Sequence, residues 1–279
     1  MGLNQLKGKV NMLSVRNLKY DVVDEDQGEV GIIHDISMEV PDGQFVVITG
    51  PNGGGKSSLA KCIAGVYQPT GGQILFEDQD ITSMSITDRA KLGISFAFQQ
   101  PVRFKGIEVF DLLKLASGDK QLSVGSACQY LSEVGLCAKD YINREVDASL
   151  SGGELKRIEI ASVLARKSRL SIFDEPEAGI DLWSFSNLIK AFEKIKRETN
   201  GSIVIISHQE RILEIADTII VIEKGRVKAS GAREEILPGL LGTESAYPSC
   251  RQGSQNEDES DCLPDNAGGM ADFLKGGLE

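Results

Sequence analysis

The sequence predicts an α/β fold with a parallel-sheet core, an N-terminal antiparallel β subdomain and an inserted helical subdomain. Three observations predict it. Apolar strands and helical segments alternate after residue 153, which is typical of a parallel sheet with crossover helices. The stretch before residue 50 is rich in β-forming residues, and residues 107–147 follow a helical pattern.

The elements before residue 107 are predicted from β-forming runs bounded by turn residues. An acidic turn at residues 24–28 separates the first two strands, and a Pro-Asp-Gly turn at residues 41–43 precedes the third. A glycine-rich loop then leads into a helix. The expected elements are strands at 13–22, 32–40, 45–48 and 74–76 and a helix at 56–66.

The later elements follow from hydrophobic periodicity. The helix after Gly153 has apolar residues at Leu155, Ile158, Ala161 and Leu164, which is a 3.6-residue spacing. The expected elements are helices at 109–116, 127–135 and 182–199 and strands at 170–173, 203–207, 218–222 and 227–229. We expect one domain over residues 1–242, with a helical subdomain at about 107–165, and an acidic, flexible tail at 243–279.

Composition limits the class of protein. The net charge is −11, and residues 243–279 contribute −6 of it, so neither part has the basic surface of a nucleic-acid binder. No apolar run is long enough to cross a bilayer and the N-terminus lacks an apolar signal core, so we expect a cytoplasmic protein. The five cysteines include no C-x-x-C pair, which favours reduced thiols, also at Cys250 and Cys262.

The glycine-rich loop matches the pattern of a phosphate-binding loop between a strand and a helix. Glycines let backbone N–H groups converge on phosphate oxygens, and the N-terminus of the helix adds favourable dipole charge. Lys56 is suited to the β- and γ-phosphates, and Ser57 to Mg²⁺. The candidate nucleotide-binding residues here are Gly50, Pro51, Asn52, Gly53, Gly54, Gly55, Lys56, Ser57 and Ser58.

Two further stretches carry candidate chemistry. An apolar strand ends in Asp174 and Glu175, where Asp174 is suited to holding Mg²⁺ and Glu175 to polarising an attacking water as a general base. Ser151-Gly152-Gly153-Glu154 begins the next helix upstream. This stretch also matches a capping box, in which Ser151 and Glu154 cap the helix without any ligand. Its two glycines favour close approach of a ligand over a purely structural cap.

These motifs, in this order across residues 12–236, resemble the ATP-binding subunits of ATP-binding cassette (ABC) proteins. The resemblance implies an ATPase that uses ATP and Mg²⁺ and that is completed by a second copy of itself, which supplies Ser151 and Gly153. It implies that Gln99 senses Mg²⁺ and the water and that His208 contacts the γ-phosphate. Asp181 matches the loop that crosses the dimer, and it equally suits the N-cap of the following helix.

Three stretches resemble SufC, the ATPase family of the SUF iron–sulfur cluster assembly system. They are residues 96–102, residues 151–160 and residues 208–213. This resemblance implies a soluble scaffold partner of the SufB/SufD kind and no membrane partner. The alternative is the ATP-binding subunit of a membrane transporter, in which a groove beside residues 99–106 would receive a short helix of the membrane subunit. Many cassettes have an aromatic residue that stacks on the adenine. Val22 occupies that position in this sequence, and Tyr20 lies two residues earlier.

Overall fold

The computed structural model describes residues 11–24, 28–198 and 201–242. The chain divides into two compact units, Met1–Leu240 and Leu241–Glu279, and the elements below belong to the first unit, apart from the last two residues of the helix at Arg233–Gly242. The predicted acidic tail at residues 243–279, with Cys250 and Cys262, lies outside the described residues and stays a prediction. Cys62, Cys128 and Cys137, which are described, are free thiols.

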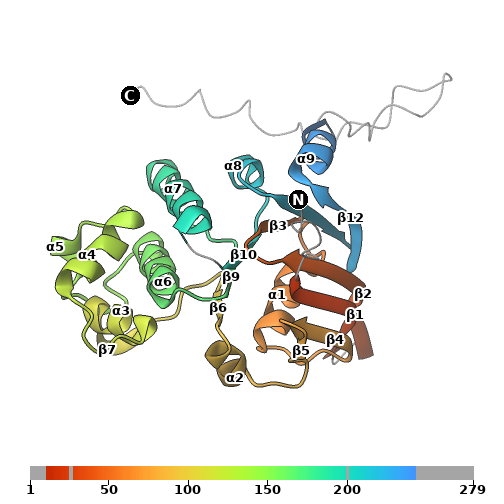
Figure 1. The fold of residues 1–279 in the computed structure, drawn as a ribbon, viewed down its shortest axis with the longest axis horizontal. Helices are drawn as coiled ribbons and strands as arrows, with labels where there is room; N and C mark the ends of the chain where they lie inside the picture. Colours follow the sequence, from red (N-terminus) through yellow and green to blue (C-terminus); the bar gives the residue numbers. More distant parts are fainter. Residues whose placement is uncertain (1–10, 25–27, 199–200, 243–279) are drawn as a thin grey trace, which may run out of the picture. The chain divides into compact units, whose positions relative to one another are not determined.

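A mixed sheet, ten-stranded over the described residues, forms the centre of the first unit (Figure 1). Its parallel part consists, in spatial order, of β11 (Thr218–Glu223), β3 (Phe45–Thr49), β10 (Ser202–Ile206), β9 (Leu170–Asp174) and β6 (Ile94–Ala97). The remaining strands, towards the other edge, are β12 (Arg226–Ala232), β2 (Gly28–Pro41), β1 (Asn11–Asp24), β4 (Gly71–Phe76) and β5 (Gln79–Asp80). Antiparallel pairing of β2, β1, β4 and β5 confirms the predicted combination of a parallel core and an N-terminal antiparallel part.

The central strand β3 separates two hydrophobic cores. Phe45 and Val47 face one cluster, whereas Val46 and Ile48 face the other, as expected because successive side chains of a strand point to opposite faces. The first core is covered by α6 (Gly152–Arg166) and α7 (Leu182–Glu198), and the second by α1 (Lys56–Ala64). A strand covered on both faces carries apolar residues at every position, and all five residues of β3 are buried.

The helical subdomain packs against α6 and α7, on the side away from α1 (Figure 1). It contains α3 (Val109–Ser117), α4 (Val124–Glu133) and α5 (Ala138–Tyr141). It also contains a short antiparallel pair, β7 (Phe104–Glu108) with β8 (Glu145–Val146), which the sequence did not predict. Other elements that were not predicted are α2 (Ile86–Lys91), β6, α8 (Glu210–Glu214) and α9 (Arg233–Gly242). Within the described residues, no helix is both long and apolar enough to cross a membrane.

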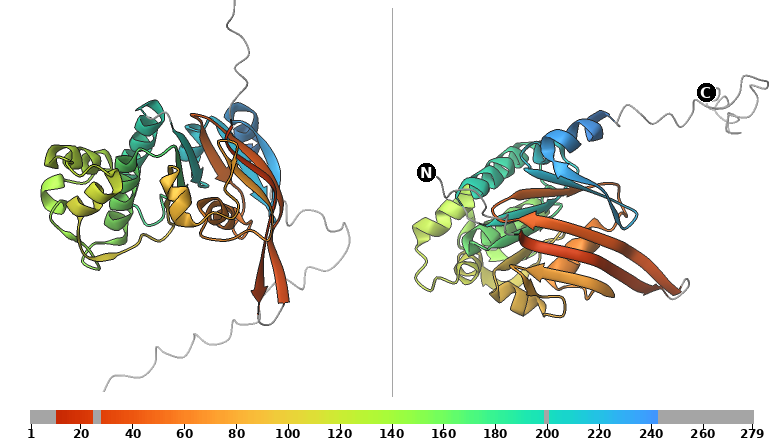
Figure 2. Two further views of the ribbon diagram at one scale, coloured as in Figure 1. Left: turned by 60° about the horizontal axis from the view of Figure 1, so that its bottom comes forward. Right: turned by 45° about the vertical axis from the view of Figure 1, so that its right-hand side comes forward.

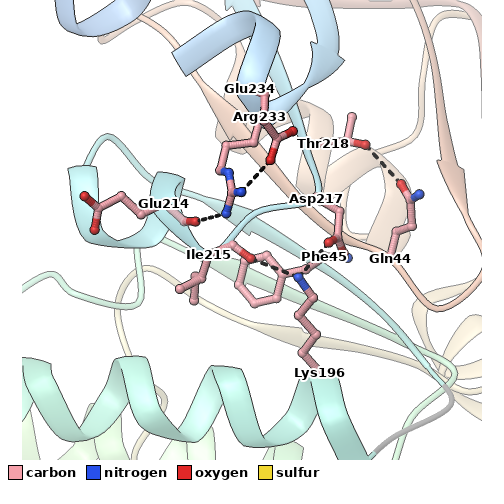
Figure 3. A network of polar contacts seen from close by, with 9 residues as sticks. All are labelled: Gln44, Phe45, Lys196, Glu214, Ile215, Asp217, Thr218, Arg233 and Glu234. Carbon is pink, nitrogen blue, oxygen red and sulfur yellow. Dashed lines mark hydrogen bonds and ion pairs between the residues drawn. The ribbon is translucent and has the colours of Figure 1, made fainter. Parts of the chain in front are cut away.

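Two further features of the sheet are a long ribbon and a polar network at one end of β3. Strands β1 and β2 form the ribbon, which extends beyond their neighbours (Figure 2). At the amino end of β3, Asp217 accepts a hydrogen bond from the backbone N–H of Phe45 at 2.9 Å (Figure 3). Asp217 also forms an ion pair with Lys196 of α7 at 2.6 Å. Thr218 donates to Gln44 at 3.0 Å beside it. This network fixes α7 to the end of β3 that lies opposite the glycine-rich loop.

Candidate functional site

The candidate site residues follow four neighbouring parallel strands at the point where each strand ends. The glycine-rich loop follows β3, His208 lies two residues after β10, Glu175 directly follows β9, and Gln99 lies two residues after β6. These strands are neighbours in the order β3, β10, β9 and β6. Because the carboxyl ends of parallel strands meet at one edge, the sheet gathers these segments there, as in other open α/β sheets.

The glycine-rich loop, called the phosphate loop from here on because it matches the pattern of one, has a backbone that only glycine adopts easily. Gly50 has φ of 131°, and a Cβ at this position would lie 2.0 Å from the carbonyl oxygen of Ile222. Gly55 has φ of 96° and forms the N-cap of α1 without a capping side chain. The first-turn N–H groups of α1 therefore face the loop without a competing side-chain acceptor, which is the arrangement of an anion site at a helix N-terminus.

Lys56 folds over its own loop. Its ammonium group donates to the carbonyl oxygens of Gly50 at 2.8 Å and Pro51 at 2.9 Å, and the residue is buried. Burial lowers the pKa of Lys56, although the carboxylates of Glu175 and Asp174 oppose the shift. The other predicted loop residues follow the same path, with Pro51, Asn52 and Gly53 exposed, Gly54 buried and Ser58 half-buried in the first turn of α1.

Ser57 and Asp174 form an oxygen pair that fits Mg²⁺. The Ser57 hydroxyl donates to Asp174 Oδ1 at 2.9 Å. Asp174 is fully buried, and within the described residues its Oδ2 atom has no hydrogen-bond partner. Burial raises the pKa of Asp174, and the bond from Ser57 opposes this. A buried carboxylate oxygen left without a partner beside a hydroxyl oxygen matches the ligand chemistry of Mg²⁺.

Gln99 and Glu175 are in direct contact. The side-chain amide of Gln99 donates to Glu175 Oε2 at 2.5 Å, which joins the segment after β6 to the segment after β9. Glu175 has φ of 46°, a left-handed conformation that is uncommon outside glycine, and its N–H donates to Ile206 O at 3.0 Å. Such a backbone costs free energy unless its surroundings hold it, and it is found disproportionately at functional sites.

His208 is exposed and lies beside the half-buried carboxylate of Glu177, which the sequence did not single out as a site residue. Glu177 Oε1 accepts the hydroxyl of Ser207 at 2.5 Å, and the same hydroxyl oxygen accepts the N–H of Gln209 at 3.0 Å. Burial raises the pKa of Glu177, and its neighbours Ser207 and His208 oppose the shift. Glu177 therefore connects the loop after Glu175 to the loop that carries His208.

The N-terminus of α6 carries the capping box that was the structural alternative for Ser151. The Ser151 hydroxyl accepts the N–H of Glu154 at 3.3 Å, and Glu154 accepts the N–H of Ser151 at 2.7 Å. The Tyr141 hydroxyl also donates to Glu154. No hydrogen bond or ion pair among the described residues joins Ser151 or Gly153 to the phosphate loop. The structure thus separates these two residues from the contacts that gather Ser57, Gln99, Asp174 and Glu175.

The loop after β9 lies against this helix end. A Cβ on Gly153 would lie 3.0 Å from the carbonyl oxygen of Gly179. Asp181 Oδ1 accepts the N–H of Ser184 at 3.0 Å, the contact expected of an N-cap for α7. Tyr20 stacks on Tyr67, with ring centroids 5.0 Å apart and an interplanar angle of 7°, so one face of the Tyr20 ring is covered by the protein itself.

Sequence analysis missed four residues that support the site. Tyr141 holds Glu154, Glu177 holds Ser207, and Lys156 and Glu159 of α6 bind the backbone next to Gln99. The only signal for the last two is a charged pair at i, i+3 within an otherwise apolar helical pattern. Nothing in the sequence indicates the partners of Tyr141 or Glu177, because both contacts join segments that are distant along the chain.

Comparison with known proteins identifies the family of this chain. The family model described as "ABC transporter" matches residues 33–178, just over half of the chain. An uncharacterized ABC transporter ATP-binding protein of Methanocaldococcus jannaschii is 38% identical over 232 residues, covering 81% of this chain and 92% of that protein. A probable ATP-dependent transporter, ycf16, of Antithamnion sp. is 34% identical over 241 residues, covering 81% and 93%.

The fold is also that of solved cassettes. A dimeric structure of a post-hydrolysis state of an ATP-binding cassette, bound to ADP and Pi, has a TM-score of 0.71 at 20% identity and covers 80% of this chain and 99% of that chain. This likeness concerns the fold alone. The extent and identity of the sequence matches place the chain in the ABC transporter family, as an ATP-binding ABC ATPase.

Proposed function

We propose that this ATPase changes the conformation of a soluble iron–sulfur cluster assembly scaffold of the SufB/SufD kind, and that two copies close around ATP to do so. The observation that carries this proposal is a contact between two of the stretches that resemble the SUF ATPases. Glu159, in the stretch 151–160, accepts the N–H of Phe98, in the stretch 96–102, at 2.9 Å. Two of the stretches that resemble the SUF ATPases are therefore in direct contact with each other and are not separate surface features.

The chemistry proposed for each site follows from the contacts within one chain. Lys56 and the backbone N–H groups of residues 50–57 other than Pro51 bind the phosphates. Ser57, Asp174 and Gln99 would hold Mg²⁺, which would supply positive charge next to the phosphate oxygens. Glu175 takes a proton from the attacking water, and Gln99 orients its carboxylate. His208 contacts the γ-phosphate. The second copy supplies Ser151 and Gly153, which are not connected to the phosphate loop of their own chain, and Asp181 lies at the junction.

A groove next to Gln99 is the proposed docking place for the partner. Its volume is about 310 Å³, and its walls come from α2, the segment 94–104 and α6. Most lining residues are apolar, and three of them, Ile86, Val102 and Phe104, are exposed. Because Phe98 lines this groove and Gln99 follows it, an occupant lies one residue away from the contact with Glu175.

Co-purification tests the proposal. Glu175→Gln is expected to hold ATP without turnover, so tagged protein with this substitution, incubated with Mg-ATP, should retain its partner. Lys56→Ala, which removes the phosphate-binding ammonium, is the matched control and should retain less. Recovery without detergent of a soluble, cysteine-bearing scaffold supports the proposal. Recovery of a polytopic membrane protein, in detergent only, would overturn it.

That second outcome describes the alternative function, the ATP-binding subunit of a membrane transporter, located in the cytoplasm. The names of the relatives favour it, since the protein from Antithamnion is described as a probable ATP-dependent transporter. In this alternative the same groove receives a short helix of the membrane subunit. Recovery of the partner with and without detergent, from one preparation, therefore distinguishes the two functions.

A further inference from the structure

An ion pair on α6, between Lys156 and Glu159, supports the site described above but has no role in the chemistry proposed for it. Lys156 Nζ lies 3.4 Å from Glu159 Oε2, and the two side chains are 1% and 16% exposed. Burial lowers the pKa of Lys156 and raises that of Glu159, although each partner opposes the shift of the other. Replacing a buried ion pair by apolar residues is often neutral or stabilising. A charged pair inside an apolar helix face therefore points to a task other than stability.

The pair binds the backbone that carries Gln99. Glu159 Oε1 accepts the N–H of Phe98 at 2.9 Å, and Lys156 Nζ donates to the carbonyl oxygen of Phe98. The same ammonium group lies 3.4 Å from the carbonyl oxygen of Gln99. Both backbone groups of Phe98, directly after the end of β6, are therefore held by α6 rather than by a neighbouring strand.

The backbone held by the ion pair leads to Glu175, the proposed general base. Gln99 donates from its side chain to Glu175 at 2.5 Å, so a shift of the Phe98–Gln99 backbone moves the amide relative to Glu175. Glu159 also lines the groove, together with Phe98, Leu155 and Ile158. The ion pair thus connects one wall of the groove to the amide that orients Glu175.

We infer that Lys156 and Glu159 are positioning residues for ATP hydrolysis: they fix the Phe98–Gln99 backbone so that the Gln99 amide stays on Glu175. This inference rests on the proposed roles of Gln99 and Glu175. It assigns no contact with ATP to the pair, so the effect belongs to the rate of the chemical step and not to nucleotide affinity.

Two substitutions of Glu159 separate positioning from stability. Glu159→Asp keeps the charge beside Lys156 but is one methylene too short to hold Phe98 N–H as well. We expect kcat of basal ATP hydrolysis to fall by about tenfold to a hundredfold, as small misplacements of reacting groups do, while KM for Mg-ATP stays unchanged. Glu159→Gln keeps an oxygen for Phe98 N–H but leaves Lys156 unpaired. We expect it to lower the melting temperature and to keep most of kcat.

Glu133→Asp is the matched control. Glu133 of α4 pairs with Lys194 at 2.5 Å and is 16% exposed, like Glu159, but it does not line the groove. This variant shortens the carboxylate of a comparable ion pair, so it should leave kcat and KM unchanged even if the melting temperature falls. A loss of kcat that follows the melting temperature across the Glu159 variants would overturn the inference, because it would show a structural role alone.

A double-mutant cycle with Gln99→Ala completes the test. If the pair acts through Gln99, Glu159→Asp lowers kcat in the native background and has no further effect in the Gln99→Ala background. An equal fold loss in both backgrounds would contradict the inference. If Gln99→Ala alone leaves kcat unchanged, the proposed role of Gln99 fails instead, so the two failures are distinguishable.

Discussion

Three carboxylates of one short segment lie in different surroundings, and this difference assigns their tasks. Asp174 is fully buried and holds Ser57, with one oxygen left over for a cation. Glu175 contacts Gln99 from a left-handed backbone. Glu177 faces Ser207 and the loop of His208. Carboxylates in unlike surroundings take unlike roles, and this supports the proposal that Asp174 binds Mg²⁺ while Glu175 acts as the base.

The first prediction concerns Glu175. Glu175→Gln removes the base but keeps the size of the side chain, so we expect nucleotide binding to persist and phosphate release to fall by about 10²–10⁴-fold. Steady-state phosphate release and binding of a fluorescent ATP analogue measure the two quantities. Glu210→Gln, at an exposed position of α8, is the control and should hydrolyse ATP normally. Turnover near the native rate in Glu175→Gln would remove Glu175 from the chemistry.

The second prediction concerns the pH dependence of stability. Because burial raises the pKa of Glu177, the folded protein binds this proton more tightly than the unfolded chain does, whose glutamates have a pKa of about 4.3. The stabilisation from Glu177 is therefore complete below that pH and is lost as the pH rises through the raised pKa. Glu177→Gln removes this loss, because an amide does not ionise and its oxygen still accepts from Ser207.

Thermal melting at two pH values measures the difference in stability between Glu177→Gln and the native protein. We expect Glu177→Gln to melt above the native protein at about pH 8, with each 1 kcal/mol raising the melting temperature by about 2–4 °C in a domain of this size. The difference should shrink at about pH 4, below the pKa of glutamates in the unfolded chain, because the raised pKa of Glu177 then keeps the native carboxyl protonated. Glu214→Gln, at an exposed position, should show no such dependence. An equal difference at both pH values would contradict ionisation of Glu177 as the cause.

At the scale of elements, the N-terminus of α6 combines a helix cap with a proposed binding surface. The third prediction separates them. Ser151→Ala removes the cap and should cost about 1 kcal/mol of folding free energy. Ser123→Ala is a matched control, because Ser123 caps α4 in the same way, accepting the N–H of Ser126 at 3.1 Å.

Both variants should lose similar stability in urea denaturation, whereas only Ser151→Ala should lose ATPase activity. This follows because the cap of α4 faces no proposed ligand, while Ser151 is proposed to meet the nucleotide of the second copy. If the two variants keep equal activity, Ser151 is a helix cap and nothing more.

At the scale of the whole molecule, the fourth prediction is nucleotide-dependent assembly. With Mg-ATP, Glu175→Gln should elute as a dimer in size-exclusion chromatography, because uncleaved ATP holds the two copies together. Without nucleotide it should elute as a monomer. Adding Ser151→Arg should prevent dimer formation by placing a bulky cation at the proposed contact with the second copy. A monomer at high concentration with saturating Mg-ATP would contradict the two-copy site.

Sequence patterns predicted the main elements where they were long or strongly periodic. The parallel strands other than β6, and α6, were expected because buried strands show continuous apolar runs and α6 shows a 3.6-residue spacing. Apart from α9, which is ten residues long, the elements that were missed, such as α2, β8 and α8, are six residues long or shorter. Segments of that length show too little periodicity to identify and are stabilised by tertiary packing instead.

The sequence by itself determined the fold class and the identity of the phosphate-loop and carboxylate residues. These depend on local signals: glycines at special backbone angles, an apolar strand before them, and acids at the end of another strand. Only the tertiary structure decided which of these residues touch. The contact of Gln99 with Glu175, the hold of Lys156 and Glu159 on Phe98, and the bond between Glu177 and Ser207 all join segments far apart in the chain. Such contacts are set by strand order and helix packing, which no local pattern encodes.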